Sequence, residues 1–222
     1  MGYIGQTPTA VHLDGDDLAN DIITLAKMAS GTDGNIISYD ASGNPVAIAT
    51  GSDGQVLTST GAGSAPAFET LTTGKVLQVV NVIDGDVATG TTVLPSDNTI
   101  AQNTEGDQFL SLAITPSNAS NKLIIHVCIT GGSSAVTSTG AALFQDSTAN
   151  ALAQTHHYNS QATALNNLSF IHYMAAGTTS ATTFKVRCGG AGSNTFSFNG
   201  SGGTRVGGDV MASSITITEI AV

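Results

Sequence analysis

Two adjacent histidines, followed by a tyrosine and an asparagine, are the residues of this chain best suited to chemistry. Within ten residues of His156 and His157, the only Cys, Asp or Glu is Asp146. One histidine from each of three chains could form an all-imidazole metal site. Adjacent residues on a strand, however, point to opposite sides. We therefore predict no metal, and an exposed loop in which His156, His157, Tyr158 and Asn159 bind a ligand by hydrogen bonds; the shared metal site is the alternative.

Hydrolysis of a sugar polymer would call for a pair of carboxylates. The carboxylates after residue 74 are Asp84, Asp86, Asp97, Glu105, Asp107, Asp146, Asp209 and Glu219. Most of them stand in turn sequences, where Asp has an ordinary structural role. The sequence contains no nucleophile elbow, P-loop or dinucleotide-binding motif. We predict that the protein is not an enzyme, has no catalytic residues and uses no cofactor.

The two cysteines also lack a motif. Cys128 and Cys188 lie in strand-like runs and not in a C-x-x-C pattern. Free cysteine is among the most buried residue types. Two buried, reduced thiols are therefore the prediction, and a disulfide or a metal site is the alternative.

The chain carries little charge, and its sign is acidic. Charged residues make up 10% of the sequence, and the net charge is −10. Two of the six basic residues, Lys185 and Arg187, alternate with apolar residues and would share one face of a strand. Six scattered basic residues do not form the dense footprint that nucleic-acid binding needs. No signal-peptide pattern and no run of about 18 apolar residues occurs. We expect no nucleic-acid partner, no membrane insertion and synthesis in the cytoplasm.

Residues 1–30 contain the one good helix candidate. Asp residues at 14, 16 and 17 could cap it, and Leu18, Ile22 and Leu25 follow at helical spacing. These three residues are candidates for a short seam between chains. One and a half heptads is too little to hold chains together alone. We predict that residues 1–30 are an anchor that docks on other proteins.

Residues 31–73 hold a 20-residue repeat. Gly34, Gly54 and Gly74 mark the period, and each is followed by a polar residue and two aliphatic ones. A repeat this short cannot bury its own apolar face. We predict a stalk of three intertwined chains in which the other chains give each short strand its partner, with Ile36 and Val56 at the interface. A flexible linker is the alternative.

Residues 74–222 predict one all-β domain. Alternating or doubly apolar runs occur at 76–82, 109–115, 122–129, 141–145, 168–174, 183–188, 195–198 and 210–220. About eight strands with Gly, Ser and Asn turns favour a jelly-roll-like β-sandwich. The run 123–129 is apolar on both faces, so Ile124 is predicted to face another subunit. The loops at the ends of the sandwich have hydroxyl and amide groups that suit neutral sugars.

Four segments carry a resemblance to a known family. The chain resembles tail-fibre or head-fibre proteins of tailed bacteriophages, notably of marine viromes, in GYIGQTPTAV, DIITLAKMA, the tandem GTDGNIISYDASGNPVAIATGSDGQVLTSTGAGSAPAFE and GGDVMASSITITEI. The resemblance implies a homotrimeric virion protein with an N-terminal anchor, a thin stalk and a C-terminal knob related to tumour-necrosis-factor-like jelly rolls. It transfers no catalytic residues, because the matching motifs are structural.

This resemblance leaves three functions open. The first is a fibre whose knob contacts host surface glycans. The second is a head fibre or cement protein that decorates the capsid, which the short repeat segment favours. The third, less favoured, is a tailspike that degrades polysaccharide.

Overall fold

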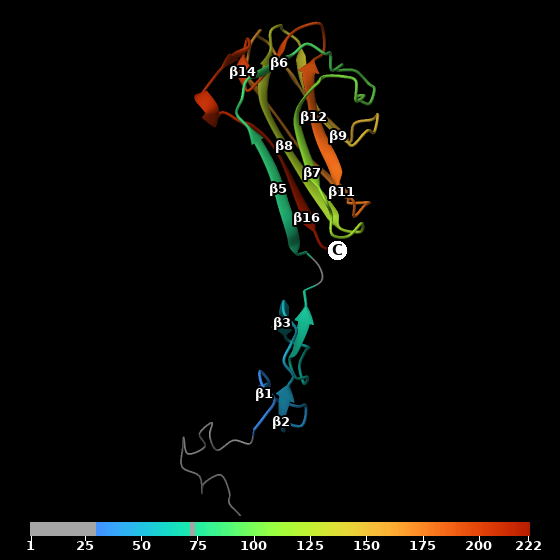
Figure 1. Ribbon diagram of the computed structural model, residues 1–222, viewed down its shortest axis with the longest axis vertical. Coiled ribbons are helices and arrows are strands. Elements are labelled where there is room, and N and C mark those ends of the chain that lie inside the picture. The colour runs from blue at the N-terminus through green and yellow to red at the C-terminus, as the bar shows by residue number, and fades with distance from the viewer. Residues whose placement is uncertain (1–29, 72–73) are drawn as a thin grey trace, which may run out of the picture. The chain divides into compact units, whose positions relative to one another are not determined.

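The computed structural model describes residues 30–71 and 74–222, and the chain divides into two units between Leu71 and Thr72 (Figure 1). The predicted helix with Leu18, Ile22 and Leu25 lies outside the described residues.

Each copy of the repeat forms an antiparallel hairpin. β1 (Ile36–Tyr39) pairs with β2 (Pro45–Ile48), and β3 (Gln55–Thr58) pairs with β4 (Ala67–Thr70). The strands therefore find their backbone partners within their own chain. The expectation that other chains supply these partners is wrong, because the Gly-rich turns bring the two halves of each repeat together.

The glycines that mark the period share one backbone conformation. Gly34, Gly54 and Gly74 have φ angles of 75°, 79° and 72°. This left-handed region is open to glycine at little cost. The 20-residue period is thus a period of backbone conformation, and Gly74 carries it up to the first strand of the second unit.

The hairpins have no interior of their own. None of residues 30–71 is buried, and Ile36 and Val56 remain 39% and 45% exposed. A two-stranded hairpin alone is at best marginally stable in water. Both side chains are free to contact other chains, and their place at an interface stays a prediction.

The second unit is an all-β, jelly-roll-like sandwich, as predicted (Figure 1). Its strands are β5 (Val76–Asp84), β6 (Ala88–Gly90), β7 (Asp107–Ile114), β8 (Lys122–Ser133), β9 (Ser138–Gln145), β10 (Ala153–Tyr158), β11 (Asn166–Ala175), β12 (Thr182–Gly190), β13 (Phe196–Phe198), β14 (Gly200–Ser201), β15 (Thr204–Arg205) and β16 (Ser213–Ile220), with one short 3-10 helix, η3 (Gly208–Val210). All eight predicted runs contain strands.

Two antiparallel sheets build the sandwich. The smaller sheet has the order β10-β9-β12-β7. In the larger sheet β8 is central: one of its edges pairs first with β16 and then with β13, and the other edge pairs with β11. β5 lies beyond β16, and β6 lies beyond β13.

The inner faces of the two sheets form the core. Leu123, Ile125, Val127 and Ile129 of β8 are fully buried, and they pack with residues of the opposite sheet such as Phe184. Full burial of such a side chain contributes about 1.5–3 kcal/mol. The fold follows from this alternation, because a shift of one residue would expose the whole set.

The outer face of the larger sheet is also rich in apolar side chains, and we call it the apolar face. Its apolar members are Val76, Val79, Ile83, Ile124, Ile171, Tyr173 and Ile220. One row across the sheet runs from Val79 through Thr218 and Ile124 to Tyr173. Val79 and Tyr173 are 57% and 60% exposed. Ile124 therefore points away from the core, as the two-sided apolar run predicts.

Candidate functional site

Three of the four predicted ligand-binding residues lie on a strand and not in a loop. His156, His157 and Tyr158 belong to β10, an edge strand of the smaller sheet that pairs with β9. The expectation of an exposed loop is wrong because β10 lacks the apolar alternation by which a strand is recognised. As a strand, β10 sends these three side chains to alternate sides.

The side chain of His156 lies beneath residues 91–106, a segment that covers the outer face of the smaller sheet. Its ring lies over Gly140, where a Cβ atom would come within 2.6 Å of the ring and 2.9 Å of Leu94. Both ring nitrogens are buried without a hydrogen-bond partner among the described residues. Burial lowers the pKa of His156, and the carboxylate of Asp97 opposes this by raising it. His156 is therefore a neutral packing residue.

The other three residues do not form one surface with His156. Tyr158 is 66% exposed, and His157 is exposed. Asn159 is buried, where its Oδ1 accepts hydrogen bonds from Thr139 Oγ1 at 3.3 Å and from Asn166 Nδ2. Only His157 and Tyr158 are available to a ligand in this structure, and they lie on opposite sides of β10.

Replacing His156 by leucine is expected to reduce the loss of stability in mild acid. In the unfolded chain a histidine takes up a proton near pH 6.5, whereas buried His156 resists it, so stability falls as the pH drops below about 6.5. Urea unfolding at pH 7 and at about pH 5 measures this change.

His157→Leu is the matched control, because His157 is exposed. Burial also lowers the pKa of His172, but that residue is present in every protein compared, so its contribution cancels. Equal acid sensitivity of His156→Leu and the parent would contradict the prediction.

The covering segment, residues 91–106, crosses the outer face of the smaller sheet; we call it the strap. Leu94 and Ala101 of the strap pack on Ala142 and Phe144 of β9 as a second small core. The Thr92 amide and hydroxyl donate to the Asp107 carboxylate at 2.8 and 2.7 Å. The strap thus covers the apolar side chains on the outer face of β9.

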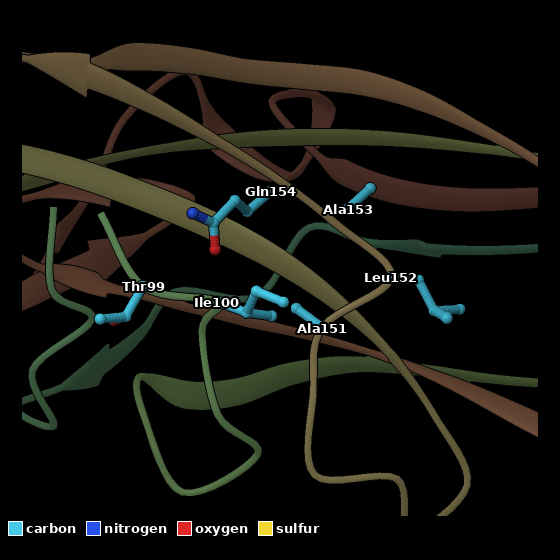
Figure 2. Close-up of a pocket in the computed structure, with 6 residues that line it drawn as sticks. All are labelled: Thr99, Ile100, Ala151, Leu152, Ala153 and Gln154. Atoms are coloured by element: carbon cyan, nitrogen blue, oxygen red, sulfur yellow. The ribbon is translucent and has the colours of Figure 1, made fainter. Parts of the chain in front are cut away.

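A shallow hollow of about 310 Å³ lies between the strap and β10. Figure 2 shows Thr99 and Ile100 of the strap on one side, and Ala153 and Gln154 on the other. Gln154 Oε1 accepts a hydrogen bond from the Ala101 amide at 3.3 Å, so it closes the hollow toward the strap. A lining of four apolar residues with one hydroxyl and one amide could hold the face of a small neutral group, and it offers no nucleophile paired with a base.

A second hollow, of about 280 Å³, lies on the same side of the sandwich and is polar; we call it the basic hollow. Its lining residues are Asn103, Gln108, Phe144, Asp146, Ser147, Lys185 and Arg187. Their sites come from four places in the chain, namely the strap, β7, the end of β9 and β12. The alternation of β12 places Lys185 and Arg187 together on its outer face, but only the sheet order adds the rest.

The described residues contain no group of three or more His, Cys, Asp or Glu that could hold a metal ion. Both thiols are free; Cys188 is buried, which raises its pKa, and Cys128 is half-buried. The alternative of a disulfide between them does not hold in this structure. Across residues 30–71 and 74–222, no helix is long and apolar enough to cross a membrane.

Comparison with known proteins gives no family. No protein-family model matches the chain, and no curated protein matches its sequence.

Solved structures give weak likenesses of two kinds. The C-terminal domain of EclA, a sugar-binding protein, is 17% identical over 51% of this chain and 73% of its own, with a TM-score of 0.30. A structure of infectious bursal disease virus, Gx strain, is 12% identical over 80% of this chain and 39% of its own, with a TM-score of 0.38. The VP2 subviral particle of that virus is 12% identical over 80% of this chain and 47% of its own, with a TM-score of 0.33. Likenesses at these TM-scores carry no argument about function, and the chain spans less than half of the two viral chains.

Proposed function

We propose that this chain is a non-enzymatic structural protein of a tailed-bacteriophage virion. It is made in the host cytoplasm, assembles as a homotrimeric fibre, attaches to other virion proteins through residues 1–30 and presents its sandwich to glycans on the host surface. The observation that carries the proposal is the apolar face on the larger sheet.

The apolar face supports assembly with copies of the same chain. Large exposed apolar patches mark interaction sites in soluble proteins. Here the row from Val79 to Tyr173 lies at the end of the sheet where β5 begins, the end at which the chain enters from the repeats. Three copies could bury this end of the sheet against one another while their repeat segments run side by side.

The repeat segment supports the same assembly. Its exposed aliphatic residues include Ile37 and Leu57, at 59% and 46%, one from each hairpin. They occupy equivalent places in the two repeats, so one set of contacts between chains would serve both hairpins. Intertwined chains must separate before any one of them unfolds, which would make the fibre resistant to heat.

Charged substitutions on the apolar face are expected to break the assembly. In the double variant Ile124→Asp/Tyr173→Asp, three pairs of carboxylates would be brought together without partners in an apolar interface. Light scattering on the parent should give about three times the 22.2 kDa of one chain, and on the variant one chain mass.

Val210→Asp is the control, because Val210 is 92% exposed and lies in η3, outside the row from Val79 to Tyr173 that carries the two substitutions. It should stay trimeric, and circular dichroism should show the same β content in all three proteins. A parent protein that scatters as a monomer at micromolar concentration would refute the proposed assembly.

A non-enzymatic role is supported by the hydrogen bonds that several described carboxylates accept from nearby groups. Asp97 accepts hydrogen bonds from Thr99, Asp107 from Thr92, and Asp146 from its neighbours in β12. Carboxylates that hold turns and straps in this way are not poised as an acid and base pair across a sugar. Release of reducing sugar from host capsule by the purified protein would overturn this part of the proposal.

Attachment to the capsid is the second candidate, and the shortness of the repeat segment favours it. Two hairpins give little reach beyond the particle. Antibodies to the sandwich distinguish the candidates on whole virions. Label on the tail supports a tail fibre, and label spread over the shell supports a head fibre or cement protein.

A further inference from the structure

The basic hollow contains two basic side chains that form no ion pair with a described residue. Lys185 and Arg187 are two of the six basic residues in a chain of net charge −10. Among the described residues, the one ion pair joins Arg205 to Asp86, so neither Lys185 nor Arg187 contacts a carboxylate there. Two neighbouring cations repel each other, and one unpaired carboxylate in the lining offsets only part of their charge.

Backbone oxygens hold the two cations in place. Lys185 Nζ donates to the Asp146 carbonyl at 2.8 Å, and Arg187 donates from Nε and Nη2 to the Glu105 and Gly106 carbonyls at 2.9 and 2.7 Å. These bonds orient both side chains without cancelling their charge. Two of the three ammonium donors of Lys185 and the Nη1 group of Arg187 have no partner among residues 30–71 and 74–222.

Asp146, the carboxylate in the lining, forms no ion pair with either cation, so the two basic side chains and one carboxylate leave the lining with a net charge of +1. Asp146 Oδ1 accepts from the Thr183 amide and Oδ2 from the Thr182 hydroxyl, each at 2.8 Å. Its φ of 51° turns the chain at the end of β9, and its carbonyl is what reaches Lys185. Asp146 therefore shapes the hollow through its backbone.

The rest of the rim can hydrogen-bond to hydroxyl groups. Gln108 and Ser147 are exposed, and within the described part of the chain their side chains make no hydrogen bond. Amide and hydroxyl groups around a charged centre suit a ligand that carries both an acid group and neutral hydroxyls. A volume of about 280 Å³ holds one sugar ring.

The basic hollow also lies where a trimer would leave it open. It is on the outer face of the smaller sheet, whereas the apolar face is on the outer face of the larger one. Assembly through the apolar face would point three basic hollows outward.

We propose that the basic hollow binds an acidic sugar, a residue with a ring carboxylate such as a uronic acid. The carboxylate accepts hydrogen bonds from Lys185 Nζ and Arg187 Nη1, and the sugar hydroxyls meet Gln108 and Ser147. This inference rests on the proposed contact with host glycans, and it names the class of glycan.

Calorimetric titration of the full-length protein with a galacturonic acid trimer tests the site, with a galactose trimer as the neutral probe. The acidic trimer should bind at least about tenfold more tightly than the neutral one, because hydrogen bonds to charged groups are the stronger ones. Binding should weaken as salt is raised. Lys185→Met should weaken it about tenfold while keeping the aliphatic stem.

Lys75→Met is the matched control, since it removes the same charge from an exposed lysine outside the basic hollow. Acidic-sugar binding that is absent, or unaffected by Lys185→Met, overturns the inference. Sodium sulfate that binds as tightly as the acidic trimer, with the same dependence on Lys185, would make this a bare anion site and would also overturn it.

These outcomes are separable from the proposed function. If the protein is a homotrimer and binds the neutral sugar without dependence on Lys185, the acidic-sugar site is refuted and the fibre proposal stands. If the protein is monomeric and binds the acidic sugar as expected, the acidic-sugar site is supported and the proposed trimeric fibre is refuted.

Discussion

Replacing Glu219 by alanine is expected to lower the free energy of unfolding of the sandwich by about 2–3 kcal/mol, because it removes the acceptor of four hydrogen bonds, one of them from the buried side chain of Asn121. Glu219 is fully buried on β16. Its Oε1 accepts from the Ser117 amide and hydroxyl at 2.8 and 2.9 Å and from Asn121 Nδ2 at 2.6 Å; its Oε2 accepts from Gln78 Nε2 at 2.5 Å. One carboxylate thus joins β5, β16 and the turn before β8.

The same carboxylate makes stability depend on acid. Burial alone would raise the pKa of Glu219, but the hydrogen bonds from Asn121, Gln78 and Ser117 outweigh it and lower the pKa to about 2. Because the pKa is lower in the folded protein, Glu219 takes up a proton in the unfolded chain at a higher pH than in the folded one. The stabilising contribution is therefore complete above about pH 4.5 and is lost as the pH falls toward about 2.

Urea unfolding at a fixed protein concentration measures both effects. Glu219→Gln keeps the shape without the charge, so it should be destabilised at pH 7 and lose less stability than the parent between about pH 4.5 and pH 2. Glu69→Ala is the control, since it removes an exposed carboxylate from β4. If Glu219→Ala were no less stable than Glu69→Ala, Glu219 would not hold this junction.

Alanine at Gly132 is expected to destabilise the sandwich by about 2–3 kcal/mol, because an added methyl group has no room. Gly132 lies in β8, next to the connection from β10 to β11. A Cβ atom there would stand 2.0 Å from the Ala164 carbonyl oxygen and 3.0 Å from its carbon. These are backbone atoms, so the connection itself would have to move.

Gly192→Ala is the matched control, because no atom outside its chain neighbours lies within 4 Å of a Cβ at that position. It should leave the unfolding midpoint within about 0.5 kcal/mol of the parent. If Gly132→Ala were as stable as Gly192→Ala, the prediction would be wrong, because the connection from β10 to β11 could then move without loss of stability.

The strands of the core were predictable from the sequence because their signal is local. Ile215 and Ile217 alternate with threonines along β16, and Phe184 and Val186 alternate with basic residues along β12. Each pattern states which side of its strand is buried. β10 escaped prediction because, as an edge strand, it carries polar residues on both sides, which resembles a loop.

The candidate sites were only partly predictable. Four consecutive residues, 156–159, looked like one site, but pairing with β9 buries Asn159 and places His156 under the strap. Conversely, Phe144 lies on the face of β9 that points away from the main core, and the strap covers it. A sequence pattern shows which side chains share a face, but it does not show what covers that face.

By itself, the sequence determined the 20-residue period, the glycine turns that produce it and the alternation of the core strands, since each depends on residues that are neighbours along the chain. Only the tertiary structure decided which distant groups meet. Glu219 and Gln78 are 141 positions apart, and the basic hollow draws on four separate segments. The physical reason is that sheet order and register, which no local pattern encodes, set these contacts.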